Sequence, residues 1–145
     1  MKKEPLFSYD PNSGEASCLI EDKDGNIIYG IAKCHPDDMD MANEKTGCDF
    51  AYRRAYVKVL QAYKKELKTE LRALNQLYYS MNRSKHFNPK SYENKMLQRQ
   101  IRQKQEDINY VNESIENSKK ELRYIIKEKD KFYQGIRKHR NEAKN

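Results

Sequence analysis

A small set of side chains in the first third of the chain has the chemistry to bind zinc. These are Cys18, Cys34, His35 and Cys48. Zinc accepts thiolate and imidazole ligands. However, the sequence contains no C-x-x-C pair, and neighbouring residues such as Cys34 and His35 do not easily direct both side chains at one ion. We therefore expect the cysteines to pack as small apolar residues and expect no zinc.

An acidic stretch follows, with Asp37, Asp38 and Asp40 within four residues. Carboxylates bind calcium and magnesium, but an EF-hand needs a fixed ligand spacing and a glycine at its sixth position, and neither is present. Carboxylates are also favoured before a helix, where they meet the positive end of its dipole. The stretch is interpreted as a polar turn, and no metal or other cofactor is expected.

A catalytic site needs a nucleophile, a base and a group that stabilises developing charge. The chain has three histidines, and two of them, His86 and His139, fall in a connector and near the C-terminus. Its five glycines do not cluster into a phosphate-binding loop. We therefore predict no catalytic residues and no enzymatic activity.

Positive charge is the more informative feature. The net charge is +7, with 35% charged residues, and its distribution is uneven, because residues 1–48 carry −5 and residues 49–145 carry +12. Such asymmetry favours an anionic partner, which leaves nucleotide, nucleic acid and acidic protein surface open. The alternative is a solvated helical surface with no ligand.

Basic and aromatic residues cluster at two places and are the candidates for ligand binding. Arg54 and Lys58, at spacing i, i+4, share a helix face with Arg53 beside them. Rings next to cations can stack on a base while the cations hold phosphate. The alternative is a charged helix tip capped by aromatic rings. The full candidate set is Arg53, Arg54, Lys58, Phe87, Asn88, Lys90, Tyr92, Arg99 and Arg102.

The expected fold is α+β and mostly α, in a single domain over residues 1–145. The predicted segments are an extended arm at 1–14, a β-hairpin at 15–34, an acidic turn at 35–47, a long helix at 48–82, a connector at 83–88, a second long helix at 89–140 and a frayed tail at 141–145. Asp24-Gly25 is a hairpin signal. A turn there would place Cys18 and Ile20 on one face with Ile27, Tyr29 and Ile31.

Seven-residue periodicity predicts that the two helices form an antiparallel coiled-coil hairpin. The seam of the first helix contains Leu60, Leu67 and Leu74, and that of the second contains Ile108 and Ile115, although Lys104 and Lys129 interrupt it. Asn88 and Pro89 are predicted as the N-cap and first residue of the second helix.

The second helix is predicted to be longer than the first, which covers it only to about residue 123. Five apolar residues beyond that point need a partner on the hairpin or on another subunit: Ile125, Ile126, Phe132, Tyr133 and Ile136. Each would lose about 1.5–3 kcal/mol if left in water. We therefore predict a homo-oligomer, a dimer or a larger assembly up to a hexamer.

The N-terminus has no apolar run of secretory length, and no stretch reaches 18 apolar residues. Three cysteines without a secretion signal favour reduced thiols in a cytosolic setting. No membrane contact is expected.

The order G-x-A-x-C-x-x-D-D, an acidic spacer and then G-x-x-x-A-x-x-R-A resembles a signature of small phage-encoded proteins. Here it comprises Gly30, Ala32, Cys34, Asp37, Asp38, Gly47, Ala51, Arg54 and Ala55. With the basic helical tail that follows, the chain resembles the phage anti-Thoeris sponge proteins of the first type. The match is best over residues 15–60.

The resemblance implies that the protein binds and sequesters a cyclic nucleotide immune signal without degrading it. The ligand would be a cyclic ADP-ribose isomer and, for some members, a cyclic oligonucleotide. It also implies a homo-oligomer that acts in the cytoplasm of the infected bacterial host. Two other functions stay open: an inhibitor of a CRISPR or other nucleic-acid-handling effector, which acts through basic helices, and a purely structural coiled coil.

Overall fold

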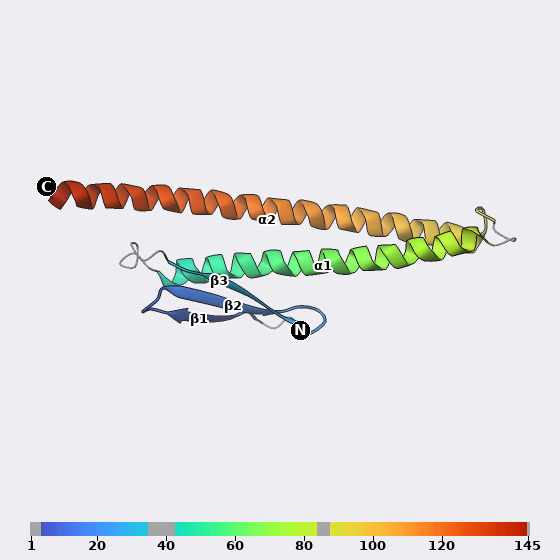
Figure 1. The fold of residues 1–145 in the computed structure, drawn as a ribbon, viewed down its shortest axis with the longest axis horizontal. Coiled ribbons are helices and arrows are strands. Elements are labelled where there is room, and N and C mark those ends of the chain that lie inside the picture. The colour runs from blue at the N-terminus through green and yellow to red at the C-terminus, as the bar shows by residue number, and fades with distance from the viewer. Residues whose placement is uncertain (1–3, 35–42, 84–87, 145) are drawn as a thin grey trace. The chain divides into compact units, whose positions relative to one another are not determined.

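The computed structural model describes residues 4–34, 43–83 and 88–144. The elements are three strands, β1 (Leu6–Asp10), β2 (Glu15–Glu21) and β3 (Ile27–Ala32), followed by α1 (Glu44–Asn82) and α2 (Tyr92–Lys144) (Figure 1). The fold is therefore α+β and mostly helical, as predicted. It divides into two compact units, a sheet unit (Met1–Val59 and Glu116–Asn145) and a coiled-coil unit (Leu60–Ile115).

Strand β1 lies where the sequence predicted an extended arm. It pairs antiparallel with β2, so that Leu6 is opposite Leu19 and Asp10 is opposite Glu15, and the strand order is β1-β2-β3. Gly14, at φ 69°, closes the connecting turn by donating its N–H to the carbonyl of Asp10 at 2.8 Å. A hairpin of two strands is marginal in water, and the third strand supplies the support that it needs.

The predicted register of the β2–β3 hairpin was wrong by one residue. Cys18 is opposite Gly30 and Ile20 is opposite Ile28, so these residues share a face with Ala32. The turn is one residue longer than a two-residue loop, because Gly25 adopts φ 83° and the N–H of Asp22 bonds the carbonyl of Asn26 at 2.9 Å. A one-residue shift turns every side chain to the other face.

The shifted register leaves the outer face of the sheet apolar and places the small residues Ala16, Cys18, Gly30 and Ala32, with Ile20 and Ile28, on the inner face. Ile27, Tyr29 and Ile31 were expected beside Cys18, but they are 69%, 53% and 37% exposed. On the inner face Gly30 lies against α1 so closely that an added Cβ would be 2.1 Å from the carbonyl oxygen of Ala51. Only glycine permits this approach of backbone to backbone.

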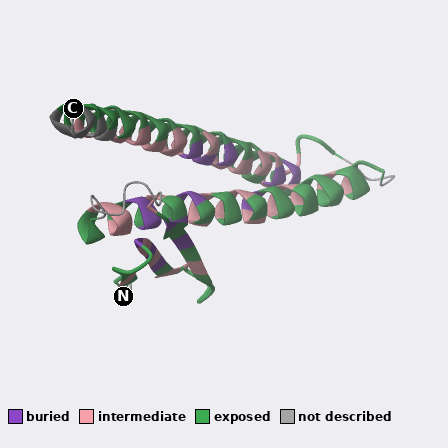
Figure 2. Ribbon diagram, turned by 60° about the vertical axis from the view of Figure 1, so that its left-hand side comes forward, coloured by how far each residue is buried: buried purple, intermediate pink, exposed green. Residues whose placement is uncertain are grey.

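The core of the sheet unit lies between the inner face of the sheet and the helices. Buried residues appear on the strands and on the side of α1 towards them (Figure 2). Leu122, Ile125 and Ile126 of α2 pack against this core. Its buried members are Ala16, Cys18, Ala32, Phe50 and Ala51.

The coiled-coil unit confirms the heptad pattern. Leu67 of α1 packs with Ile108, Val111 and Ile115 of α2, and all four are buried. The seam also contains Lys104, whose ammonium group bonds the carboxylate of Glu70. The interruption in the apolar repeat is therefore an ion pair between the helices.

Both helix starts differ from the prediction. Helix α1 begins four residues before Cys48, because the Asn43 side chain accepts the N–H of Lys45 at 2.9 Å and caps the helix. Helix α2 begins after Ser91, whose hydroxyl accepts the N–H of Asn94 at 3.3 Å. The prediction of Asn88 as N-cap was wrong.

The earlier start of α1 changes the prediction of an unpartnered end on α2. Arg53 bonds Glu121, so in an antiparallel pair the first residue of α1 lies opposite about residue 130. Ile125 and Ile126 are accordingly covered within the sheet unit, whereas Phe132 is 65% exposed. The overhang is thus shorter than predicted, and the side chain of Tyr133 lies outside the description.

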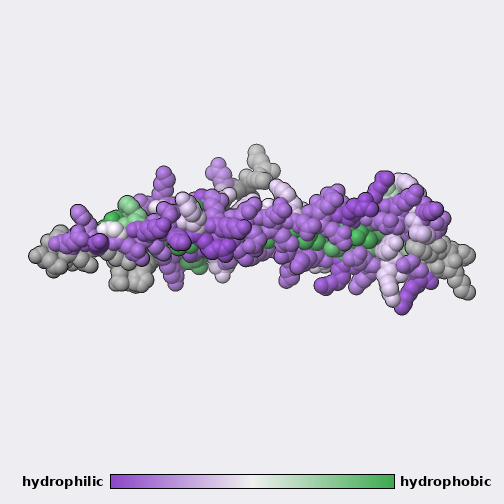
Figure 3. Space-filling model, turned by 90° about the horizontal axis from the view of Figure 1, so that it is seen from above, coloured by the Kyte–Doolittle hydropathy of each residue, from purple (hydrophilic) through white to green (hydrophobic). Residues whose placement is uncertain are grey.

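Across the described ranges, neither helix holds an apolar stretch sufficient to cross a bilayer. Hydrophilic residues cover most of the face drawn in Figure 3, with hydrophobic patches between them.

Candidate ligand-binding site

Two of the predicted phosphate-binding cations instead bind the edge of the sheet. The guanidinium Nη1 of Arg54 donates to the carbonyl of Ile31 at 2.7 Å, and Lys58 Nζ donates to the carbonyl of Tyr29 at 2.8 Å. Lys58 Nζ also lies 4.7 Å from the ring centroid of Tyr29. The two side chains do share a helix face, as predicted, but that face covers the outer edge of β3.

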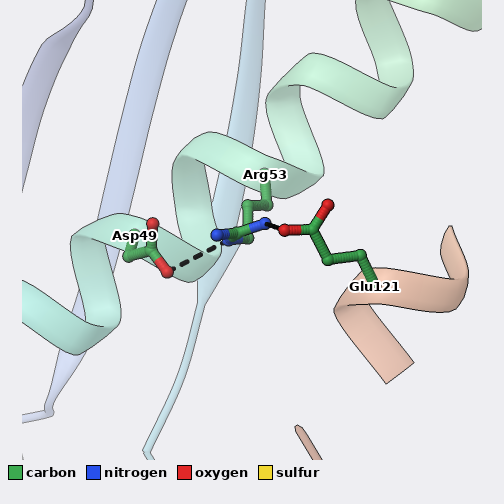
Figure 4. A network of polar contacts seen from close by, with 3 residues as sticks. All are labelled: Asp49, Arg53 and Glu121. Carbon is green, nitrogen blue, oxygen red and sulfur yellow. Dashed lines mark hydrogen bonds and ion pairs between the residues drawn. The ribbon is translucent and has the colours of Figure 1, made fainter. Parts of the chain in front are cut away.

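Arg53 forms a bridge between the helices within the sheet unit. Its Nε lies 3.1 Å from Asp49 Oδ2, and its Nη1 lies 2.7 Å from Glu121 Oε1 (Figure 4). The hydrogen bond that Arg53 donates to Glu121, followed by the one that it donates to Asp49, raises the pKa of Arg53 above its usual value. An arginine already paired with two carboxylates has little remaining capacity for a ligand phosphate.

The second cluster of predicted residues belongs to the coiled-coil unit and is a different region from Arg53. Asn88 accepts the N–H of Lys90 at 3.0 Å with its side chain and the N–H of Ser91 at 3.1 Å with its carbonyl. Tyr92 is 74% exposed. Lys90, Arg99 and Arg102 are also exposed. Phe87 lies outside the described residues.

A pocket of about 840 Å³ in the sheet unit combines aromatic rings with cations. This volume lies within the range of small-molecule sites. The pocket lies where β1, the first turns of α1 and the later part of α2 meet. We call it the aromatic–lysine pocket, and its lining is Pro5, Phe7, Lys45, Thr46, Cys48, Asp49, Phe50, Tyr52, Ile125 and Lys129.

The three rings give the pocket flat apolar surfaces. Phe50 is buried and holds the floor in the core, whereas Phe7 and Tyr52 are 50% and 38% exposed. The ammonium group of Lys129 lies 4.8 Å from the ring centroid of Phe50, a cation–π distance. An anchored ring beside two accessible rings suits stacking with a planar ligand.

The charge of the pocket favours an anion. Lys45 and Lys129 contribute two positive charges, and Asp49, the one carboxylate among the described lining residues, is paired with Arg53. Lys45 also stands in the first turn of α1, where the helix dipole is positive. Asn43 already accepts the N–H groups of Lys45 and Thr46, so the side chains rather than the helix end supply the anion contacts.

The thiol in the pocket is not activated. Burial, with a further contribution from Glu44, raises the pKa of Cys48 above its usual value, which disfavours the nucleophilic thiolate. Among the residues that the structure describes, no group of three metal-ligating side chains comes together. His35 and the acids from Asp37 to Asp40 lie outside those residues.

The sequence signature has a direct packing explanation at most of its described positions. Gly30 and Gly47 admit close contact between sheet and helix, since a Cβ on Gly47 would be 3.0 Å from that of Ala16. Ala51 and Ala55 lie next to Gly30 and are fully buried. The small residues thus allow α1 to lie on β3, and the arginine of the signature, Arg54, bonds its edge.

The sequence did not indicate the rings and lysines of the pocket as a group. Phe7 belongs to a strand that was not predicted, and Lys45 lies in the first turn of α1, which was expected to start only at Cys48. One signal was available, because Lys129 occupies an apolar position of the heptad repeat, where a charge needs a local reason.

Searches of known families, curated proteins and solved structures return no match to this chain.

Proposed function

We propose that this protein binds a small anionic ligand with a planar ring, a nucleotide, in the aromatic–lysine pocket and holds it without converting it. The observation that carries the proposal is the conjunction of Phe7, Phe50 and Tyr52 with Lys45 and Lys129 around about 840 Å³. Rings bind the base through stacking, and ammonium groups bind phosphate as point charges. The raised pKa of Cys48 supports retention of the ligand over attack on it.

The resemblance to anti-Thoeris sponge proteins narrows the ligand class. It favours a cyclic nucleotide immune signal, a cyclic ADP-ribose isomer first and a cyclic oligonucleotide second, sequestered in the cytoplasm of an infected bacterial host. A sponge needs slow release more than fast binding. A pocket with a buried ring as its floor and lysines at its sides meets that need.

The test is calorimetric titration of the full chain with cyclic ADP-ribose isomers, cyclic dinucleotides and cyclic trinucleotides. We expect one class to bind with a dissociation constant below about 1 µM, which corresponds to roughly 8 kcal/mol. Replacing Lys45 and Lys129 together by glutamine should weaken binding at least tenfold. Lys127→Gln, an exposed lysine of α2 near Lys129, is the matched control and should leave binding unchanged.

A second function is favoured by a separate observation, the exposed Lys90, Arg99 and Arg102 of the coiled-coil unit. Binding to long DNA or RNA that weakens steeply with salt would support an inhibitor of a nucleic-acid-handling effector. Absence of heat with every cyclic nucleotide and every nucleic acid would reject both functions and leave a structural coiled coil.

A further inference from the structure

The two edges of the sheet differ in whether other parts of the molecule bond their backbone groups. At the outer edge of β3, Arg54 and Lys58 bond the carbonyls of Ile31 and Tyr29. At the other edge, no strand of the described residues lies beyond β1 (Figure 1). An open edge is a template for another strand, and proteins commonly block it with charge, proline or cover.

The pairing pattern shows which backbone groups of β1 are open. The carbonyls of Tyr29 and Ile31 point away from β2, so the backbone N–H and C=O groups of Gly30 and Ile28 point towards β2. The backbone groups of their partners Cys18 and Ile20 therefore point towards β3, and those of the intervening Ser17 and Leu19 point towards β1. Ser8 and Leu6 are the partners of Ser17 and Leu19, so their backbone groups point towards β2.

The N–H and C=O groups of Phe7 and Tyr9 consequently point outwards. No charged residue stands at either position, and the side chains are aromatic. Leu6 is 67% exposed and Phe7 is 50% exposed. The edge is thus both hydrogen-bonding and apolar.

We propose that β1 pairs antiparallel with β1 of a second copy of this chain across a two-fold axis at Ser8. This register places Phe7 opposite the second copy's Tyr9, so every outward N–H and C=O of the two residues is paired. Pro5 then meets Pro11 beyond the two ends of the strand, where neither has an N–H to satisfy and only their carbonyls gain no partner. A shift by two residues in either direction instead sets a proline against Tyr9 or Phe7 and leaves the carbonyl of that residue, inside the strand, without a donor.

The side chains fit the same register. Phe7 and the second copy's Tyr9 form a cross-strand aromatic pair on the face towards the helices, a favourable combination in antiparallel sheets. Phe7 also lines the aromatic–lysine pocket. The second copy therefore adds a ring beside the mouth of that pocket. This last step rests on the proposed function, whereas the strand pairing does not.

Cysteine cross-linking tests the pairing without any ligand. Ser8 and its counterpart form a non-hydrogen-bonded pair with Cα atoms about 4.5 Å apart, which falls within disulfide range. Under mild oxidation, Ser8→Cys should give mostly covalent dimer at micromolar concentration. Wild type, which contains Cys18, Cys34 and Cys48, measures the background.

Two variants check the register. Leu6→Cys and Asp10→Cys should each cross-link poorly alone but form a mixed dimer when combined, because Leu6 faces the second copy's Asp10. Efficient cross-linking of Leu6→Cys alone, or none for Ser8→Cys, overturns the proposal.

Light scattering of the unmodified chain adds an independent measurement. We expect a dimer in wild type and at least tenfold weaker dimerisation in Phe7→Pro, which removes an outward N–H but no hydrogen bond within the sheet. Phe7→Ala keeps the N–H and should weaken it less. A wild type that remains a single chain at micromolar concentration overturns the pairing and leaves the edge to a strand of another protein. A wild type that forms the dimer but binds no nucleotide would instead count against the proposed function alone.

Discussion

The sheet unit and the coiled-coil unit are packed by opposite means. In the sheet unit the buried residues are mainly small, and the backbones of β3 and α1 approach until there is room only for Gly30. In the coiled-coil unit large aliphatic side chains, such as Leu67 and Ile108, fill the space between the helices. The sheet unit should therefore be destabilised by substitutions that add side-chain atoms at the contact between strand and helix. The coiled-coil unit should be destabilised by substitutions that remove side-chain atoms from its core.

The largest effect is expected from Gly30→Val. Its Cβ would be 2.1 Å from the carbonyl oxygen of Ala51 and 2.6 Å from the backbone nitrogen of Ala55, and neither backbone can move without displacing α1. We expect the free energy of unfolding to fall by about 3 kcal/mol or more. Urea denaturation, with hydrogen exchange to locate the loss in the sheet unit, measures it.

The matched control is Gly135→Ala, because nothing lies within 4 Å of the added Cβ and the site is helical. This change should stabilise α2 by up to about 1 kcal/mol. Equal behaviour of the two glycine variants would show that the close contact at Gly30 is absent.

Leu67→Ala should produce the next largest effect, and in the other unit. Leu67 is 2% exposed, and its removal leaves a cavity in the seam. We expect the free energy of unfolding to fall by about 2–3 kcal/mol, the lower part of the usual range for such a change. The neighbouring Leu60 and Leu71 are only partly buried and can move into the cavity. Leu77→Ala, at a residue 52% exposed, should cost clearly less.

Arg54→Met should have a smaller effect on stability, about 0.5–1 kcal/mol. It removes the bond to the carbonyl of Ile31, but the site is exposed and water can replace the guanidinium. Arg123→Met, at an exposed arginine of α2, is the control for lost charge. If nucleotide affinity fell while stability was unchanged, Arg54 would be a ligand residue, as the sequence predicted, rather than part of the sheet edge.

The smallest effect on stability is expected from pH. Acid should destabilise the sheet unit and alkali the coiled-coil unit. In the sheet unit, hydrogen bonds led by that from the N–H of Asn12 lower the pKa of Asp10 below 3.8, so its contribution is complete above pH 3.8 and is lost as pH falls through the folded pKa. In the coiled-coil unit, Glu70 raises the pKa of Lys104 above 10.5, so its contribution is complete below pH 10.5 and is lost as pH rises through the folded pKa.

Amide chemical shifts followed by NMR across both pH ranges measure this contrast. Alkaline loss in the sheet unit, or acid loss confined to the coiled-coil unit, would contradict the assignment. Lys104→Met should abolish the alkaline transition without affecting the acid one.

The sequence predicted the coiled-coil unit better than the sheet unit, for a physical reason. Heptad repeats are local, and Leu67, Ile108 and Ile115 report their burial through spacing alone. Strand pairing is not local, and one extra residue in the loop around Gly25 was enough to change the register of the hairpin. β1 was missed because Pro5 and Pro11 bound a run of only five residues, and its partner strand is what defines it.

The candidate site was harder to predict than the fold. Lys58 and Arg54 were identified correctly as neighbours, but the sequence could not show that carbonyls of β3 already occupy them. The pocket residues come from three separate elements, and their meeting depends on the missed strand and on the cap at Asn43. Charge and ring composition suggested the kind of site, whereas its place required the tertiary structure.

The bonds from Arg54 and Lys58 to β3 also set a limit on growth. A sheet with two open sides would recruit copy after copy and polymerise into filaments, but here one side is closed by the molecule's own helix. If β1 pairs with a second copy as proposed, addition stops after that one step, because both outer edges of the joined sheet are then edges of β3. The contacts that fix the helix to the sheet would thus also limit the assembly to two chains.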